Sequence, residues 1–236
     1  MHSTLIDSRF LGSLFSTPEM KQVFSDNGTL ARYTETEVAL ALAEGKLGLI
    51  PAEAAKAIAE RASQIALDMD RLERETHNVG YPILPLVHQL AEGLGDAGKF
   101  LHWGATTQDI MDTALVLQIR AGLDLVEADL RGVAAQLRRL SAEYRDTPMA
   151  GRTHLQHALP VTFGLKTAIW LGMVERNLER LQQLRPRVLV GQFAGAGGTL
   201  ASLGQRGLEV QVAMMAELKL GVPETTWHTA RDGLAR

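Results

Sequence analysis

The feature that most constrains the fold of this chain is a long stretch without proline. From Gln108 to Tyr144 there is no proline, and only Gly122 and Gly132 are glycine. Because proline and glycine are the residues that most disfavour a helix interior, this stretch predicts one helix of about 35 residues, roughly 50 Å long. A compact chain of 236 residues does not need so long a helix. We therefore expect it to pack against helices from other copies of the chain.

A polar segment, H-W-G-A-T-T-Q-D, leads into this helix from His102 to Asp109. Thr106 or Thr107 suits the N-cap position, and Asp109 in the first turn complements the helix dipole. Such a helix start carries free backbone N–H groups and hydroxyls, which can hold a carboxylate or a phosphate. An ordinary cap without a ligand would use the same residues, so this segment alone leaves both interpretations open.

The rest of the chain predicts helices and no strands. Hydrophobic residues make up 46% of the sequence but aromatic residues only 5%, and this reliance on Ala and Leu favours helices. We expect an all-α protein with an N-terminal helical domain over 1–101 and an incomplete long-helix bundle domain over 102–236. The patterns predict a polar loop over 149–160 and further helices over 34–48, 51–65, 70–76, 83–94, 161–185 (ended by Pro186) and 205–220.

Charge and composition argue against several classes of function. The formal net charge of -3 gives no electrostatic basis for binding nucleic acid or an anionic membrane. The sequence has no cysteine, which excludes thiolate chemistry and fits the cytoplasm, the expected location. The first residues lack the pattern of a secretory signal, and no run of about 18 apolar residues predicts a membrane span.

A second polar segment, G-R-T-H-L-Q-H, runs from Gly151 to His157. Histidine is the side chain best suited to move protons near neutral pH, and Arg152 could orient a carboxylate. The spacing of His154 and His157 also suits a pair of metal ligands. However, no second cluster of metal-binding residue types accompanies them, so we expect no metal. A hydrogen-bonded loop without a chemical role is an equally good interpretation.

Two further segments are more weakly indicated. The glycine-rich stretch 191–204 could let backbone N–H groups approach an anion, but it lacks the P-loop pattern. A connection between helices that needs positive φ angles is the simpler interpretation. His77 and Asn78 precede Tyr81 and Pro82 near a predicted helix end, where asparagine commonly serves as a C-cap. On the residues alone, this pair favours a structural role.

Taken together, these segments resemble the fumarase/aspartase superfamily. The stretch His102–Thr113 is similar to its first signature region, and Gly151–Ala158 with Pro160 is similar to its second. The glycine-rich stretch resembles the segment that follows, and the resemblance covers essentially the whole chain. Within the superfamily, the sequence is most similar to bacterial enzymes that lactonize 3-carboxy-cis,cis-muconate in aromatic degradation. The stretches that carry this similarity are G-A-T-T-Q-D-I-M-D-T, A-L-P-V-T-F-G-L-K and A-G-G-T-L-A-S-L-G.

The adenylosuccinate lyases are the rival branch of the superfamily. Their N-terminal motif resembles the stretch from Ser13 to Met20. Where those lyases carry arginines for the nucleotide phosphate, this chain has Leu14 and Thr17, and Phe15 replaces their tyrosine. These replacements count against a phosphorylated nucleotide as substrate.

The resemblance implies a homotetramer in which three subunits build each active site around a small polycarboxylate substrate, with no cofactor. It assigns proton transfer to His154, paired with Thr153. His77 and Asn78 stand where adenylosuccinate lyases carry a His-Asp pair. The residues expected to bind substrate are His102, Thr106, Thr107, Arg152, Gln156, His77 and Asn78.

The chemistry of the superfamily suits these residue types. Its members interconvert an alkene carboxylate and its adduct through a carbanion held as an aci-carboxylate, so donors that face the carboxylate stabilise the developing charge. In lactonization the substrate's own carboxylate attacks the double bond. The enzyme then has to position the substrate and deliver a proton to the adjacent carbon.

One feature of the superfamily is absent from the sequence. Its third signature, a serine-containing G-S-S-x-M-P-x-K-x-N loop, does not occur before the end at Arg236. We therefore expect the chain to be a fragment that is truncated within the central domain. An inactive helical assembly module is the alternative to an enzyme at this point. A relative that acts on a sulfonated muconate would also share these motifs.

Overall fold

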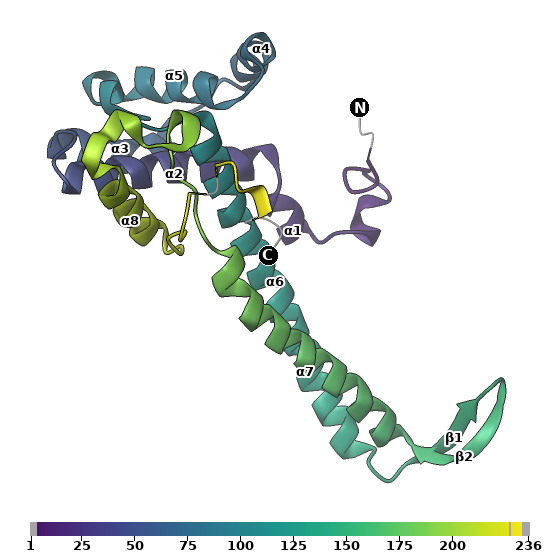
Figure 1. The fold of residues 1–236 in the computed structure, drawn as a ribbon. Coiled ribbons are helices and arrows are strands. Elements are labelled where there is room, and N and C mark those ends of the chain that lie inside the picture. The colour runs from purple at the N-terminus through teal and green to yellow at the C-terminus, as the bar shows by residue number, and fades with distance from the viewer. Residues whose placement is uncertain (1–3, 227, 233–236) are drawn as a thin grey trace. The chain divides into compact units, whose positions relative to one another are not determined.

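The structure is a computed structural model that describes residues 4–226 and 228–232. Over these residues it is mostly helical, as the sequence predicts for an all-α protein (Figure 1). Its helices are α1 (Pro18–Val23), α2 (Asp26–Lys46), α3 (Ala52–Arg61), α4 (Met69–Val79), α5 (Ile83–Leu94), α6 (Thr107–Glu143), α7 (Phe163–Val188) and α8 (Gly207–Leu218). Short 3-10 turns lie at Gly12–Leu14, Ala62–Gln64, Gly95–Phe100, Ala196–Gly198 and Ala201–Arg206. A two-stranded sheet consists of β1 (Pro148–Thr153) and β2 (Gln156–Thr162).

The long proline-free stretch forms one helix, which confirms the prediction for α6. It spans 37 residues, and Asp109 lies in its first turn. The preceding long helix, α2, begins at a side-chain cap, where the hydroxyl of Ser25 accepts a hydrogen bond from the backbone N–H of Gly28 at 3.0 Å. A serine in this position satisfies one of the free N–H groups at the helix start.

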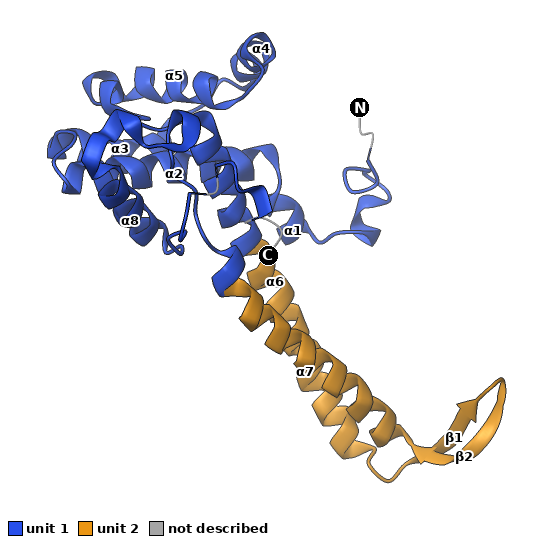
Figure 2. Cartoon of the chain, in the orientation of Figure 1, with its two compact units in different colours: residues 1–120, 186–236 blue, residues 121–185 orange. Residues whose placement is uncertain are grey.

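The chain divides into two compact units (Figure 2). Unit 1 contains residues 1–120 and 186–236, and unit 2 contains residues 121–185. Helix α6 contributes residues to both units. The domain boundary predicted between residues 101 and 102 stays a prediction. The two compact units are divided elsewhere, after residues 120 and 185, and do not test it.

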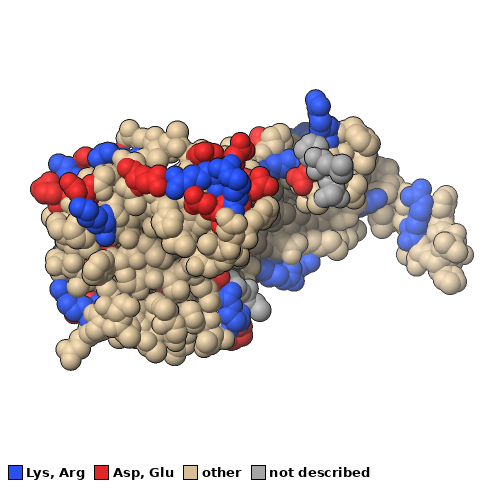
Figure 3. Space-filling model, turned by 90° about the horizontal axis from the view of Figure 1, so that it is seen from above, with Lys and Arg blue, Asp and Glu red and all other residues tan. Residues whose placement is uncertain are grey.

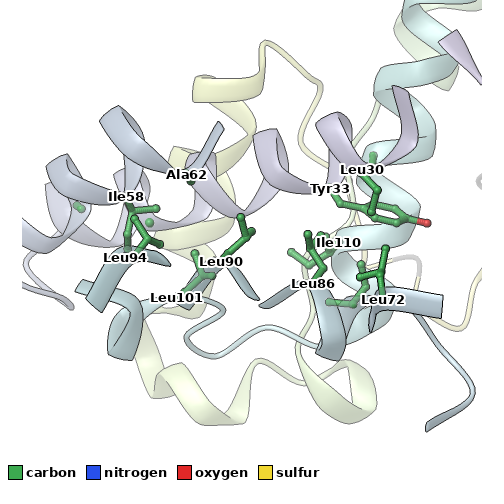
Figure 4. Close-up of a cluster of buried hydrophobic side chains, with 14 of the residues drawn as sticks. Leu30, Tyr33, Ile58, Ala62, Leu72, Leu86, Leu90, Leu94, Leu101 and Ile110 are labelled. Atoms are coloured by element: carbon green, nitrogen blue, oxygen red, sulfur yellow. The ribbon is translucent and has the colours of Figure 1, made fainter. Parts of the chain in front are cut away.

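Unit 1 contains two clusters of buried apolar side chains. In the first, α5 contributes Leu86, Leu90 and Leu94, which lie among side chains of α2, α3 and the start of α6 (Figure 4). In the second, α8 contributes Met214 and Met215, which are buried with Leu40, Phe193 and Leu117. Helix α2 takes part in both clusters and is therefore central to unit 1.

Ion pairs lie over the surface of unit 1. Arg71 of α4 bonds Glu75 on its own helix and Glu92 of α5, at 2.6 and 2.7 Å. Figure 3 likewise shows acidic and basic side chains close together on the face that it draws. Exposed pairs of this kind contribute little to stability. No helix in the described ranges is long and apolar enough to cross a membrane.

Unit 2 is a pair of antiparallel helices joined by the hairpin (Figure 1). Its helices are linked by ion pairs, with Arg138 on α6 bonding Glu175 on α7 at 2.7 Å and Arg185 bonding Asp124 at 2.7 Å. Several large apolar side chains of this unit are exposed: Val126, Val133, Leu165, Ile169, Trp170 and Met173. Two helices alone do not bury these faces.

The prediction of a loop over 149–160 was wrong, because these residues form most of the β1–β2 hairpin. The strands pair from Pro148 with Thr162 to Thr153 with Gln156, and a bulge interrupts the register at Gly151. The two loop residues, His154 and Leu155, have φ angles of 43° and 61°, as tight hairpin turns require. Most of the hairpin's residues are exposed, so the polar–apolar alternation that identifies a half-buried strand is missing.

The predicted end of the helix before Pro186 was also wrong. Helix α7 continues to Val188, with Pro186 inside it. Proline removes one backbone donor and disfavours the preceding turn, but so close to the C-terminus few helical hydrogen bonds remain to be lost. The helix can therefore include the proline and end two residues later.

Candidate functional site

The start of α6 is fixed by a buried aspartate. The carboxylate of Asp109 accepts hydrogen bonds from the backbone N–H groups of Thr106 at 3.0 Å, Ala194 at 2.9 Å and Gly195 at 2.9 Å. The side-chain amide of Gln192 donates a fourth bond at 3.2 Å. Burial raises the pKa of Asp109, and these four bonds oppose that rise. Asp109 thus joins the helix start to the glycine-rich segment in addition to complementing the dipole.

Three more contacts attach distant segments to the same part of α6. The hydroxyl of Thr113 donates to the carbonyl of Gln192 at 2.7 Å and accepts from its N–H at 2.9 Å. The amide of Gln108 donates to the carbonyl of His228 at 2.8 Å, and Arg231 forms an ion pair with Asp112. Segments from three parts of the sequence therefore meet at one end of α6.

Glycines allow the backbone to pass closely at this meeting point. Gly104, Gly195, Gly197 and Gly198 all have positive φ angles. A Cβ at Gly195 would lie 3.2 Å from the carbonyl oxygen of Gly104, which is tighter than an ordinary contact. The segment is thus a connection that needs left-handed backbone, as the simpler interpretation of the sequence predicts.

Thr106 and Thr107 lie at this helix start, and both side chains are half-buried. Their hydroxyls make no hydrogen bond within the described residues, so each can donate to a bound group. Helix α6 begins at Thr107, and the N–H of Thr106 is already taken by Asp109. The two hydroxyls are therefore donors that a ligand could use.

His102 lies in the turn before α6, in unit 1 with the two threonines. Its backbone is left-handed, with φ at 60°, and its Nδ1 lies 2.6 Å from Oε1 of Glu37. Burial lowers the pKa of His102, but the charge of Glu37, its hydrogen bond and the charge of Asp109 outweigh that effect. The net pKa is above the ordinary value. The surroundings thus favour the imidazolium, which suits an anionic ligand.

Sequence reasoning missed Glu37 and a second acid on the same helix, Glu44. Both side chains are completely buried on α2. Burial, and to a lesser extent the charge of Glu37, raise the pKa of Glu44 to about 8. The two acids are seven residues apart, roughly two turns, among apolar residues. A pair of carboxylates on an apolar helical stripe was the signal that could have found them.

His77 and Asn78 lie at the end of α4, and both are exposed. The prediction of Asn78 as a C-cap was wrong. Helix α4 continues to Val79, and Gly80 is the left-handed C-cap, with its N–H bonded to the carbonyl of Thr76 at 2.8 Å. Glycine adopts this conformation at lower cost than asparagine, so the helix ends there. His77 also lines a cleft of about 520 Å³ with Tyr33, Glu73 and Pro82, among others.

The residues of the second signature region belong to unit 2. Arg152, Thr153, His154 and Gln156 are exposed on the hairpin. Arg152 pairs with His157 across the strands, and Thr153 with Gln156. Within its unit, the structure thus brings together the polar groups of this motif. His102, Thr106 and Thr107 lie in the turn and helix start of unit 1. No metal-binding group of three or more His, Cys, Asp or Glu occurs among the residues described.

Comparison with known proteins identifies the family. The model of the Lyase family matches residues 15–235. The N-acetyl-S-(2-succino)cysteine lyase of Dickeya dadantii is 44% identical over 98% of this chain and 51% of its own length. The structure of a fumarate lyase from Mesorhizobium sp. BNC1 is 57% identical with a TM-score of 0.89, over 94% of this chain and 52% of that one.

A third relative is the 3-carboxy-cis,cis-muconate lactonizing enzyme of Pseudomonas putida. Its crystal structure has a TM-score of 0.90 and 43% identity, and the match covers 96% of this chain and 52% of that one. The chain thus spans about half the length of the relatives it matches. The names of these relatives differ, but the family match and the fold agree. The chain belongs to the Lyase family, within the fumarase/aspartase superfamily.

Proposed function

We propose that the full-length protein converts 3-carboxy-cis,cis-muconate to a carboxymuconolactone without a cofactor. The observation that carries carboxylate chemistry is the cluster at the start of α6. There, the free hydroxyls of Thr106 and Thr107 lie in the same motif as an imidazole, His102, whose pKa is raised because the charge and hydrogen bond of Glu37 outweigh its burial. Donors and a positive charge of this kind stabilise a carboxylate as it gains charge.

The choice of carboxymuconate rests on two further observations. The three motif stretches are similar to the lactonizing branch, and the Pseudomonas putida enzyme is 43% identical over nearly the whole chain. Leu14 and Thr17 stand where adenylosuccinate lyases carry phosphate-binding arginines. A substrate with carboxylates and no phosphate agrees with both.

In the proposed reaction, one substrate carboxylate adds to the double bond and closes the lactone ring. Negative charge then develops on the neighbouring carbon and its carboxylate, held by Thr106, Thr107 and His102. His154, supported by Thr153, delivers the proton to that carbon. Arg152 and Gln156 would bind the remaining carboxylates. His77 and Asn78 are kept as substrate-binding candidates on the resemblance alone.

We also propose that the full-length protein is a homotetramer with active sites shared between subunits. The exposed apolar side chains of α6 and α7 need a covering surface, and other copies of the chain would supply it. The exposed hairpin would then carry His154 to a site formed with a neighbouring subunit. Light scattering that gave a monomeric mass at micromolar concentration would contradict this assembly.

A second candidate is β-elimination from a succinyl thioether. The 44% identity to the Dickeya dadantii lyase favours it, since that relative's name describes a succinylated cysteine. Elimination would use the same carboxylate donors, with the thiol as leaving group in place of an internal carboxylate. The two reactions differ in substrate and share the proposed roles of the donors.

The test is a parallel assay of the full-length protein with 3-carboxy-cis,cis-muconate, N-acetyl-S-(2-succino)cysteine and adenylosuccinate. We expect the protein to turn over the muconate and neither of the other two substrates. The loss of the muconate's ultraviolet absorbance measures this turnover. His154→Ala should lower kcat by at least about 100-fold, whereas His157→Ala, on the same hairpin, is the matched control. Turnover of another substrate alone would overturn the assignment. Loss of less than about tenfold in His154→Ala would overturn its proton-transfer role.

A further inference from the structure

The contact between Glu37 and His102 joins two elements that are far apart in sequence. Glu37 lies in the interior of α2 with a completely buried side chain, and its Oε1 is 2.6 Å from Nδ1 of His102. This short distance is typical of a charge-assisted hydrogen bond. The imidazole is itself mostly buried, with its side chain 21% exposed, in a left-handed turn. The buried carboxylate of Glu37 thus fixes the position of the imidazole ring through Nδ1.

A hydrogen bond at one imidazole nitrogen decides what the other nitrogen can do. With Nδ1–H donated to Glu37, Nε2 is the one ring nitrogen left for a ligand. Protonated, it donates a hydrogen bond to an anion; neutral, it can only accept. The charge state of His102 therefore decides whether it binds a carboxylate.

Among the described residues, the charges that favour the imidazolium of His102 come from acidic side chains. Glu37 contacts it from α2, Asp109 acts on it from the first turn of α6, and Glu44 lies two turns along α2 from Glu37. Asp109 already accepts four hydrogen bonds. Burial and the charge of Glu37 raise the pKa of Glu44 to about 8, which favours its neutral form at neutral pH. The negative charge in direct contact with His102 is therefore that of Glu37.

We propose that Glu37 is a positioning residue for the reaction: it fixes His102 through Nδ1 and keeps Nε2 protonated, so that His102 binds a carboxylate of the substrate as a cation. This inference rests on the proposed function for the identity of the substrate. The placement and charge of the imidazole can be tested without it. Glu44 makes no bond to His102 and has no part in this role.

The matched variants are Glu37→Gln and Glu44→Gln in the full-length protein. Glutamine keeps the size and one oxygen acceptor of the glutamate but removes its charge. We expect Glu37→Gln to raise KM for the muconate at least tenfold at pH 8 with a smaller change in kcat. The alkaline fall of kcat/KM should begin at least one pH unit lower, and affinity should recover only when the pH falls below the lowered pKa of His102. Glu44→Gln should keep the parent profile at neutral pH.

A second measurement separates this inference from the choice of substrate. Hydrogen–deuterium exchange at the imidazole C2 position, followed by mass spectrometry, reports the pKa of His102 without turnover. We expect that pKa to fall in Glu37→Gln and to stay in Glu44→Gln. An unchanged pKa of His102 in Glu37→Gln would overturn the inference even if the muconate is turned over. A lowered pKa without turnover of the muconate would uphold the role of Glu37 and reject the substrate. An equal loss of kcat/KM at every pH would mean that Glu37 only supports the fold.

Discussion

Unit 1 buries carboxyl groups in two regions, and their surroundings differ sharply. At the start of α6, Asp109 receives three backbone N–H groups and one side-chain amide. On α2, Oε2 of Glu37 and both oxygens of Glu44 have no hydrogen-bond partner among the described residues. Burial raises the pKa at both Asp109 and Glu44, but only Asp109 has donors that oppose the rise. The presence of hydrogen-bond donors, rather than burial itself, thus distinguishes a carboxylate that stabilises the fold, such as Asp109, from one that destabilises it when ionised, such as Glu44.

The largest effect should follow from removing the satisfied carboxylate. We expect Asp109→Ala to lower the free energy of unfolding by about 3–5 kcal/mol, because it leaves buried N–H groups of Ala194 and Gly195 without a partner. Urea unfolding followed by circular dichroism measures the loss. Asp109→Asn, which keeps one acceptor oxygen, should lose less. A cost below about 1 kcal/mol in the alanine variant would refute a structural role.

The unsatisfied carboxyl should behave in the opposite way. Glu44→Gln mimics the protonated acid, so we expect it to stabilise the protein by about 3 kcal/mol at pH 7, given a pKa of about 8 in the folded state against an ordinary value of 4.5. The raised pKa means that the folded state of the parent retains a proton that the unfolded state releases. The parent's stability therefore falls as pH rises from 4.5 to 8 and then levels.

The check on Glu44→Gln is a pair of urea titrations at pH 5 and pH 8. The variant's advantage should be small at pH 5 and greatest at pH 8. An advantage that did not change between the two pH values would show that Glu44 ionises normally. A destabilised variant at both pH values would show that the carboxyl has a favourable partner.

A smaller loss is expected where a hydroxyl performs a similar task to Asp109. Thr113 both donates to and accepts from the backbone of Gln192, and it is completely buried. Replacing it with the isosteric valine should cost about 1–2 kcal/mol, since the N–H and carbonyl of Gln192 lose this partner. Thermal unfolding at fixed pH measures this. A neutral substitution would indicate that water replaces the hydroxyl.

The smallest effect is expected for an exposed carboxylate that also accepts a backbone N–H. Asp68 caps α4 by accepting from the N–H of Arg71 at 2.9 Å. Asp68→Ala should cost about 1 kcal/mol, because water can replace the lost acceptor at an exposed helix start. Urea unfolding beside the Asp109 variants gives the comparison. A loss as large as that of Asp109→Ala would mean that burial does not decide the cost.

The helices could be predicted because their signals are local. The stretch 83–94 is bounded by Pro82 and Gly95, and α5 has those limits. The hairpin could not be predicted by pattern, because strands exposed on both faces show no alternation. Glu37 was missed for another reason: its partner lies 65 residues away, and no local pattern connects α2 to the turn at His102. The roles assigned to the signature residues, including His154, stay predictions.

The divided sequence of unit 1 has a consequence for the order in which it can fold. The first apolar cluster uses residues from Leu30 to Ala114, so it can assemble early during synthesis. The second needs Phe193 and α8, and three of the four donors to Asp109 lie more than 80 residues after it. All of unit 2 must therefore leave the ribosome before the start of α6 is complete. Until then Asp109 lacks three of its four hydrogen-bond donors, so the start of α6 is held only by the N–H of Thr106.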